Sequence, residues 1–193
     1  MPNLDPPLAY PLPPLTDLAI YLAPLTSADA DDLVELAADQ AVDAFTPLPS
    51  NANAAYIAEM LERCDRGWQE ASGAFFSIRD STSHAFLGYG AAIRLQLAAR
   101  QGELGYMVAP HARGQGVATR TLKLLTDWCF GELGLIRLEL RINTRNEASV
   151  KVAAANGYRL EGVLRSVHLK RDQRVELGIW SRLRSDPELA NSQ

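Results

Sequence analysis

The chain contains only two cysteines, Cys64 and Cys129, and no CxxC pair. Two cysteines are too few for a disulfide scaffold or for a zinc site built from several cysteine ligands. Both lie in helical patterns, where a cysteine usually behaves as a small buried apolar side chain. We therefore expect two buried free thiols in a protein of a reducing compartment, the cytoplasm.

Long apolar runs and clustered histidines are missing as well. No stretch of about 18 apolar residues occurs, which argues against a membrane span. The N-terminus has no basic segment followed by an apolar one, which argues against a signal peptide. His84, His111 and His168 fall on separate predicted elements, so no metal site is expected. The sequence thus predicts a cytoplasmic protein with neither a membrane partner nor a metal.

The chain has no excess of positive charge, because its formal net charge is −4. A dedicated nucleic-acid binder usually carries a basic excess, so no nucleic-acid partner is expected. A small anionic ligand is not excluded, because a local basic loop can hold an anion on an acidic protein. Hydrophobic residues make up 47% and charged residues 22% of the chain, which predicts an ordinary packed globular domain.

Proline is concentrated at the N-terminus, where six prolines occur within residues 1–15. Proline removes backbone donors and disfavours helix, so this segment is interpreted as an extended arm. The arm is either a free tail or a segment that packs on its own domain or on a neighbour. A single domain is predicted over residues 16–185, followed by a C-terminal tail over residues 186–193.

Hydrophobic periodicity and turn residues predict a mixed α/β (α+β) order of elements. Ser27 is expected to cap the first helix. In 135–142 apolar side chains from Ile136 onward alternate with Arg137, Glu139 and Arg141, as in a strand with one buried face. Strands are expected at 18–25, 74–79, 86–97, 103–108, 135–142, 158–170 and 175–183, and helices at 27–40, 53–70, 117–130 and 146–156.

One loop stands out between a predicted strand and a predicted helix: residues 113–119, RGQGVAT. Glycines let backbone N–H groups approach a ligand, and a helix start adds unpaired donors with partial positive charge. Arg113 adds a fixed cation with bidentate reach. This combination suits a phosphate or a pyrophosphate, although a tight strand-to-helix turn would use the same glycines.

Two common phosphate loops do not match this segment. A P-loop needs GxxxxGK[ST], and no lysine follows Gly116 in that pattern. The dinucleotide fingerprint needs a third small residue and an acidic residue at the end of the next strand. Here Thr119 occupies the third position, and the next strand carries Arg137 and Arg141. Both nucleotide-loop classes are therefore disfavoured.

The string R-G-Q-G-V-A resembles the Q/R-x-x-G-x-G/A signature of the GCN5-related N-acetyltransferases. The resemblance extends over residues 103–165, which are similar to the RimJ/RimL-type branch throughout, and plausibly covers 16–183. It implies a central, mostly antiparallel, splayed sheet flanked by helices. It also implies an acetyl-CoA-dependent N-acetyltransferase that moves an acetyl group to a primary amine by direct attack.

The same resemblance implies which residues bind acetyl-CoA. Backbone amides of the loop would hold the pyrophosphate, and the exposed edge of the preceding strand would pair with pantetheine. The asparagine and serine of the following helix match family positions. The implied set is Tyr106, Met107, Val108, Arg113, Gly114, Gln115, Gly116, Val117, Ala118, Thr119, Asn146 and Ser149.

The acceptor amine must lose a proton before it attacks a thioester. At pH 7 this costs about 4.6 kcal/mol for a lysine and about 1 kcal/mol for an N-terminal amine. Glu103 matches the position of the general base in several members of the superfamily, although a solvated strand-end glutamate is an equal alternative. Glu161 and Glu139 are weaker candidates, and Glu139 may simply pair with its arginine neighbours.

The leaving thiolate must be protonated or stabilised. Many members of the superfamily use a tyrosine seven residues after the asparagine that matches Asn146, but this sequence has Ala153 there. RimL-like members place a serine at the position of Ser149, whose hydroxyl could donate to sulfur or could only support the helix start. Tyr158, Trp128 and Trp180 are expected in the core.

The acceptor stays open between a protein N-terminus and a small-molecule amine, with the groove expected between the helices of 27–70 and the C-terminal hairpin. Two other functions are alternatives. One is a noncatalytic acyl-CoA-binding domain, which the alanine at 153 would allow. The other is transfer from another acyl-CoA such as succinyl-CoA, whose carboxylate Arg94, Arg137 or Arg141 would neutralise. A homodimer is suggested by the resemblance alone.

Overall fold

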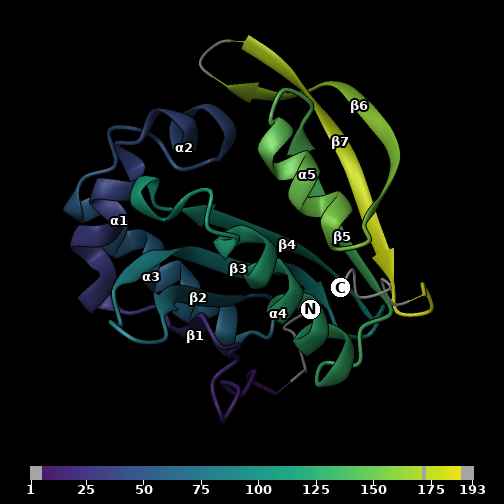
Figure 1. Cartoon of the computed structure of the whole chain (residues 1–193), viewed down its shortest axis with the longest axis horizontal. Coiled ribbons are helices and arrows are strands. Elements are labelled where there is room, and N and C mark those ends of the chain that lie inside the picture. Colours follow the sequence, from purple (N-terminus) through teal and green to yellow (C-terminus); the bar gives the residue numbers. More distant parts are fainter. Residues whose placement is uncertain (1–5, 171–172, 188–193) are drawn as a thin grey trace.

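The structure is a computed structural model that describes residues 6–170 and 173–187 (Figure 1). The strands are β1 (Ile20–Pro24), β2 (Ala74–Asp80), β3 (Phe86–Gln96), β4 (Gln101–Val108), β5 (Arg137–Asn143), β6 (Arg159–Lys170) and β7 (Gln173–Leu183). The helices are α1 (Ala30–Ala37), α2 (Gln40–Phe45), α3 (Ala54–Gln69), α4 (Val117–Gly131) and α5 (Glu147–Ala155), with 3-10 turns at Ser27–Asp29 and Pro110–Ala112.

The seven strands form one sheet in the order β1-β2-β3-β4-β5-β7-β6. Neighbours are antiparallel except for β4 and β5, which run parallel. This parallel pair is joined over three residue pairs only, of which the last is Glu103–Glu139. Beyond that pair the two strands part, as the central gap in the sheet shows (Figure 1). The predicted fold class, a mostly antiparallel splayed sheet flanked by helices, is confirmed.

Each face of the sheet has its own apolar core. Phe76 of β2 packs in one cluster with Leu122 of α4. Its neighbour Phe75 packs in a second cluster with Leu33 of α1 and Ile57 of α3. Because successive residues of a strand point to opposite faces, α4 covers one face of the sheet and the α1–α3 group covers the other.

The first helical segment differs from the single helix predicted over 27–40 with Ser27 as its cap. Thr26 is the cap, because its side chain accepts a hydrogen bond from the backbone of the next turn. The segment then breaks at Asp39, whose backbone is extended and whose carboxylate accepts two amide N–H bonds at the start of α2. A carboxylate that caps a new helix competes with continuation of the old one, so α1 and α2 are separate.

Residues 6–15 of the proline-rich arm pack on the domain. The Leu8 backbone N–H donates to the carbonyl oxygen of Trp68 over 2.9 Å. The Tyr10 hydroxyl donates to a carbonyl oxygen of β1 over 2.6 Å, and its ring centroid lies 5.6 Å from that of Trp68. Of the two alternatives for the arm, its described part takes the packed one; residues 1–5 lie outside the described residues.

The division of the chain into an arm, one domain over 16–185 and a tail over 186–193 stays a prediction. Residues 188–193 of that tail lie outside the described residues. Backbone hydrogen bonding continues beyond the end of β7, because the Arg184 N–H donates to the carbonyl oxygen of Ile136 over 3.0 Å.

The alternation predicted for residues 135–142 is observed in β5. Leu138, Leu140 and Ile142 are buried in the core. Ile136 was expected on the same buried face, and this prediction is wrong, because 45% of the residue is exposed. The strand begins one residue later, at Arg137, so the alternation of the strand does not govern Ile136.

Strands β6 and β7 form a long hairpin that extends from the body of the molecule (Figure 1). β6 is an edge strand, and every side chain in it except Lys170 is exposed. Near the tip, Lys170 Nζ donates to the carbonyl oxygen of Thr46 over 2.6 Å and lies 3.7 Å from Asp43. The hairpin therefore reaches across to the end of α2.

Candidate active site

The loop between β4 and α4 holds two glycines in the left-handed backbone region. Gly114 has φ of +74°, and Gly116, the residue before α4, has φ of +78°. Side chains rarely tolerate this region, so the backbone conformation selects glycine at both positions. A Cβ built on Gly114 would meet no described atom within 4 Å, so crowding is not the reason. The turn leaves the start of α4 open, where unpaired N–H groups carry partial positive charge.

A cavity of about 430 Å³ opens beside this loop, with walls from β4, the loop, α4, α5 and α2. It brings together every predicted cofactor-binding residue except Gln115, whose side chain donates to the carbonyl oxygen of His111 over 2.9 Å. The predicted residues that line it are Tyr106, Met107, Val108, Arg113, Gly114, Gly116, Val117, Ala118, Thr119, Asn146 and Ser149. Their role in binding acetyl-CoA stays a prediction.

One edge of β4 is unpaired beside this cavity. β4 pairs with β3 as far as Val108, whereas its pairing with β5 ends at Glu103. The segment from Tyr106 onward therefore has no strand partner on its β5 side among the described residues. Such an edge is a template for an extended ligand that carries amide groups of its own.

A smaller cavity of about 90 Å³ lies where β4 and β5 part. Its walls come from these two strands, from α2 and from α5. The two cavities adjoin, so we treat them as one cleft that runs from the glycine loop to the vertex of the splayed strands. The residues common to both walls are Phe45, Thr46, Tyr106, Asn146 and Ser149.

Ser149 and Tyr106 meet in the shared wall of the cleft. Asn146 caps α5, because its side-chain oxygen accepts the backbone N–H of Ser149 over 3.1 Å. Burial raises the pKa of the Tyr106 hydroxyl to about 12, and the Ser149 side chain opposes that rise. The Tyr106 hydroxyl makes no hydrogen bond of ordinary geometry to a described residue. Tyr106 and Ser149 thus lie together in the wall of the cleft, whereas Ala153 is fully buried in the core.

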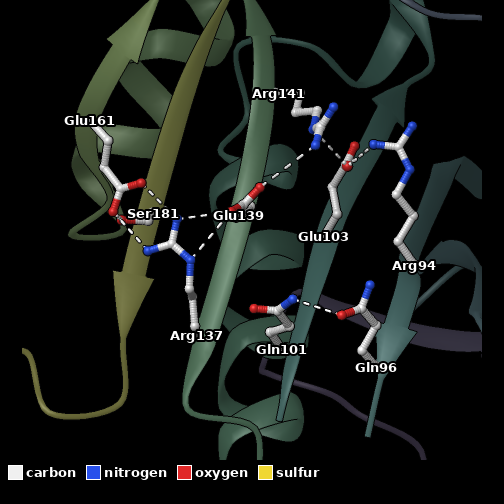
Figure 2. A network of polar contacts seen from close by, with 9 residues as sticks. All are labelled: Arg94, Gln96, Gln101, Glu103, Arg137, Glu139, Arg141, Glu161 and Ser181. Atoms are coloured by element: carbon white, nitrogen blue, oxygen red, sulfur yellow. Dashed lines mark hydrogen bonds and ion pairs between the residues drawn. The ribbon is translucent and has the colours of Figure 1, made fainter. Parts of the chain in front are cut away.

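Glu103 lies at the vertex, in a network of charged side chains that come from β3, β4, β5 and β6 (Figure 2). Its carboxylate oxygen lies 2.5 Å from Arg94 Nη1 and 3.2 Å from Arg141 Nε. Burial raises the pKa of Glu103 although the two arginines act to lower it. Glu103 lies outside the described lining of both cavities, whereas Arg141 lines the smaller one. Arg141, which contacts Glu103 and also lines the smaller cavity, therefore connects Glu103 with the cleft.

The two rival carboxylates are held in ion pairs. Arg137 Nη2 lies 2.8 Å from Glu139 and 2.6 Å from Glu161. Ser181 donates to Glu161 over 2.6 Å. These hydrogen bonds, above all those from Arg137, lower the pKa of Glu161 to about 2. A carboxylate with so low a pKa is a weak base. Glu139 and Glu161 both form ion pairs with Arg137, which is the alternative that the sequence left open for Glu139.

Arg113 has a partner that the sequence did not reveal. Its Nη2 lies 2.5 Å from the Oδ1 of Asp39, the residue that caps α2. This hydrogen bond is the main reason that the pKa of Asp39 is lowered. The pair ties the glycine loop to α2, across 74 residues of sequence. The sequence pattern placed Asp39 inside a continuous helix over 27–40, and nothing local connected it with Arg113.

The helix α2 was not predicted, because the sequence indicated helices over 27–40 and 53–70 and none between them. Ala41, Val42, Phe45 and Thr46 line the cleft. The hairpin, which was expected to line the acceptor groove as well, contributes no described residue to either cavity. Its link to the cleft is indirect, through Lys170 at the end of α2.

The two cysteines are buried free thiols, as predicted. Burial raises the pKa of Cys64 to about 12 and that of Cys129 further. Neither thiol is available as a thiolate near neutral pH.

The aromatic residues expected in the core are found there. Tyr158 and Trp128 are each 3% exposed, and Trp180 packs against the same cluster. The hydroxyls of Tyr158 and Thr126 lie 2.8 Å apart, so Tyr158 is bonded away from the cleft. Within the described ranges, no group of histidine, cysteine and acidic side chains is arranged to hold a metal, and no helix is long and apolar enough to cross a bilayer.

Known proteins share this architecture. The uncharacterized N-acetyltransferase YoaA of Bacillus subtilis (strain 168) is 23% identical over 162 residues, which cover 84% of this chain and 92% of YoaA. The spermidine N(1)-acetyltransferase of Escherichia coli (strain K12) is 34% identical over 65 residues, about a third of each chain. The solved structure of RimL, a ribosomal L7/L12 alpha-N-protein acetyltransferase in complex with coenzyme A, superposes with a TM-score of 0.80 at 15% identity and covers 86% of this chain and 95% of RimL.

The family assignment rests on a match to most of the chain. The model of the acetyltransferase (GNAT) domain matches residues 19–159, which include β1, the glycine loop and α5. The superposition on RimL agrees with the fold expected from the sequence. The chain belongs to the acetyltransferase (GNAT) family and is an N-acetyltransferase.

Proposed function

We propose that the protein transfers the acetyl group of acetyl-CoA to a primary amine, either a peptide N-terminus or a small molecule. The observation that carries this proposal is the continuous cleft that joins an anion-binding loop to an unpaired strand edge. Such a cleft suits a ligand with a pyrophosphate at one end and an amide-bearing arm behind it. The relative RimL is known in complex with coenzyme A, which supports the same donor here.

Each part of the cleft has a proposed task. The backbone N–H groups of 113–119 would bind the pyrophosphate, as expected at the start of a helix. The free edge of β4 from Tyr106 to Val108 would pair with the amides of pantetheine. This arrangement would bring the thioester to the vertex, beside Asn146 and Ser149.

The reaction would proceed by direct attack. The amine nitrogen, once neutral, forms a bond to the thioester carbonyl carbon, and the carbon–sulfur bond breaks as CoA leaves as a thiolate. Ser149, beside Tyr106, would donate a proton or a hydrogen bond to that thiolate. Glu103 would receive the proton of the ammonium group through a water molecule, because Arg141 lies between it and the cleft. The serine and the glutamate are our proposals for the catalytic acid and base.

We further propose that two copies of the chain associate through β6, in the cytoplasm. An exposed edge strand with apolar side chains is a template for pairing with another strand. Large apolar side chains that stay exposed together on one edge strand favour a contact site. The exposed apolar residues of β6 are Leu160, Val163, Leu164, Val167 and Leu169. Light scattering should show a dimer for the native chain and a monomer for Leu164→Lys/Val167→Lys; a native monomer at micromolar concentration would refute the dimer.

The proposed activity is tested by two measurements on the same preparation. Calorimetry measures acetyl-CoA binding, and a thiol-release assay measures turnover with a panel of amines and N-terminal peptides. We expect micromolar or tighter binding, and turnover with at least one amine. Tight binding without turnover on the whole panel would favour a noncatalytic acyl-CoA-binding domain instead.

A further inference from the structure

Two arginines of β5, Arg137 and Arg141, lie four residues apart on the same face of the strand but are bonded differently (Figure 2). Arg137 donates four hydrogen bonds, at 2.6 to 3.3 Å, to Glu139 and Glu161. Arg141 donates no hydrogen bond of ordinary geometry to any described residue. Its Nε lies 3.2 Å from Glu103, and its Nη2 lies 4.0 Å from Glu139. Because a guanidinium has five N–H donors, Arg141 retains donors for a ligand.

The free donors belong to a residue that lines the vertex of the cleft. Arg141 lines the smaller cavity, and 37% of its side chain is exposed. Among the described residues of that wall, it is the only charged one; the others are apolar or neutral polar groups. No described carboxylate faces either cavity. A cation with unused donors thus faces the place where donor and acceptor would meet.

From this arrangement we infer the chemical class of the acceptor. If acetyl transfer is the activity, as proposed above, the acetyl group is uncharged and the anion that Arg141 binds must belong to the acceptor. We propose that the acceptor is an α-amine that carries a carboxylate, bound by Arg141. A free amino acid and a peptide with an acidic residue next to its N-terminus both present this chemistry.

The same charge disfavours polycationic acceptors. A polyamine would bring several ammonium groups toward Arg141, which repels them, and no carboxylate of the described wall of the smaller cavity is there to pair with them. An ε-amine or polyamine amine also needs more help to lose its proton than a peptide α-amine does. The relative named for spermidine has a cationic acceptor, and the inference separates this chain from it.

Glu103 and Glu139 hold Arg141 in place before the acceptor arrives. They lie on two different strands, and Glu103 is also hydrogen-bonded by Arg94 over 2.5 Å. A guanidinium whose position is fixed in advance loses little freedom when it pairs with a carboxylate, and such pairs are often bidentate. Glu103 therefore acts on the acceptor through Arg141 as a positioning residue, in addition to any role in proton transfer.

The test compares acceptors that differ only in charge. The first pair consists of glutamate and its α-amide. The second pair consists of the peptide amides Ser-Asp-Ala-Ala and Ser-Asn-Ala-Ala, and spermidine serves as the cationic acceptor. The first pair measures whether an α-carboxylate is recognised, and the second pair measures whether an acidic side chain is recognised. We expect at least one member that carries the tested carboxylate to exceed its partner, in which an amide replaces that carboxylate, about 30-fold in kcat/KM, as for loss of a hydrogen bond to a charged group. Spermidine should be the poorest acceptor.

Two variants show whether Arg141 makes the distinction. Arg141→Gln should reduce the preference for the acidic acceptor to about threefold or less, because the charged partner is gone. Arg94→Gln is the matched control, because it removes the other arginine of Glu103 without changing the wall of the cleft. It should keep the preference for acidic acceptors. Acetyl-CoA affinity should stay within about twofold in both variants, which would show that they are folded.

Binding of the acceptors to the enzyme–CoA complex keeps the inference separate from the proposed activity. Binding of the acidic acceptor that is weakened by Arg141→Gln would support the inference even without turnover, and only the proposed activity would then fail. Equal use of acidic and neutral acceptors, or an Arg141→Gln effect of the same size on both, would overturn the inference. So would a preference for succinyl-CoA with neutral amines, because the carboxylate would then lie on the donor.

Discussion

The two ends of the cleft are built in opposite ways. The end at the glycine loop consists of consecutive residues, 113–119, and offers backbone N–H groups in a conformation that glycine allows. The end at the vertex is assembled from residues of four elements, β4, β5, α2 and α5, among them Arg141, Ser149 and Phe45. A backbone site binds what all donors share, whereas a side-chain site changes with each substitution. We therefore expect the loop end to bind the donor and a few side chains at the vertex to select the acceptor.

Gly116→Glu should have the largest effect, and only at the loop end. The residue needs φ of +78°, and a carboxylate there would repel a pyrophosphate. Acetyl-CoA affinity measured by calorimetry should fall roughly 1,000-fold, since strain and repulsion each add a few kcal/mol. Gly131→Glu, which adds the same charge at the other end of α4, is the control and should bind normally. Equal loss in both variants would show that the effect is global charge and not the loop.

Glu103→Gln should affect the vertex end without changing acetyl-CoA affinity. A base works only when deprotonated, and burial raises the pKa of Glu103, so activity should fall as pH drops through a value above that of an ordinary glutamate. The variant should lose about 100-fold in kcat, as for loss of a general base. It should also lose this acidic limb of the pH–rate profile.

Glu139→Gln is the matched control for that prediction. Glu139 lies opposite Glu103 on β5 but pairs with Arg137, so the acidic limb should persist in this variant. If the Glu103→Gln variant keeps both its kcat and the acidic limb of its pH–rate profile, Glu103 is not the general base, and only its role in positioning Arg141 would be left.

Ser149→Ala should have a smaller effect, again at the vertex. We expect kcat to fall about tenfold, less than for a lone general acid, because the hydroxyl of Tyr106 lies in the same wall. The double variant Ser149→Ala/Tyr106→Phe should lose more than the product of the two single losses, since each hydroxyl substitutes for the other. Steady-state kinetics with all three variants measures this coupling, and strictly multiplicative losses would refute it.

Asp39→Asn should produce the smallest effect and connects the two ends. Asparagine still caps α2, but the ion pair with Arg113 is removed, so the arginine is free for the pyrophosphate. Acetyl-CoA affinity should rise about threefold, because exposed ion pairs are worth less than about 1 kcal/mol. Because Arg113 lowers the pKa of Asp39, the stabilisation from this pair is present above the unfolded-state pKa and is lost as pH falls through the lower folded value. Weaker binding in this variant would mean that Asp39 instead orients Arg113 for the ligand.

The loop end was largely predictable from the sequence. Gly114 and Gly116 in a strand-to-helix turn carry a local signal, and so does Asn146 three residues before Ser149. Each of these features depends on neighbours in the chain, which a sequence pattern records directly.

The vertex was not predictable in the same way. The approach of Glu103 to Arg94 and Arg141 depends on the register of three strands, and the pairing of Arg113 with Asp39 depends on where α1 breaks. Alternation in 137–141 placed the charges on one face but could not tell a saturated arginine from one with free donors. That distinction comes from Glu161, which reaches Arg137 from β6.

The most direct test of the cleft is a crystal structure of the protein with bound coenzyme A. We predict that the pyrophosphate accepts N–H bonds from residues 114–119, that the pantetheine amides pair with β4 at Tyr106 to Val108, and that the sulfur lies beside Ser149. The acceptor side of that structure should leave Arg141 open to solvent at the vertex. Coenzyme A bound outside this cleft, or with its sulfur away from Ser149, would contradict the account.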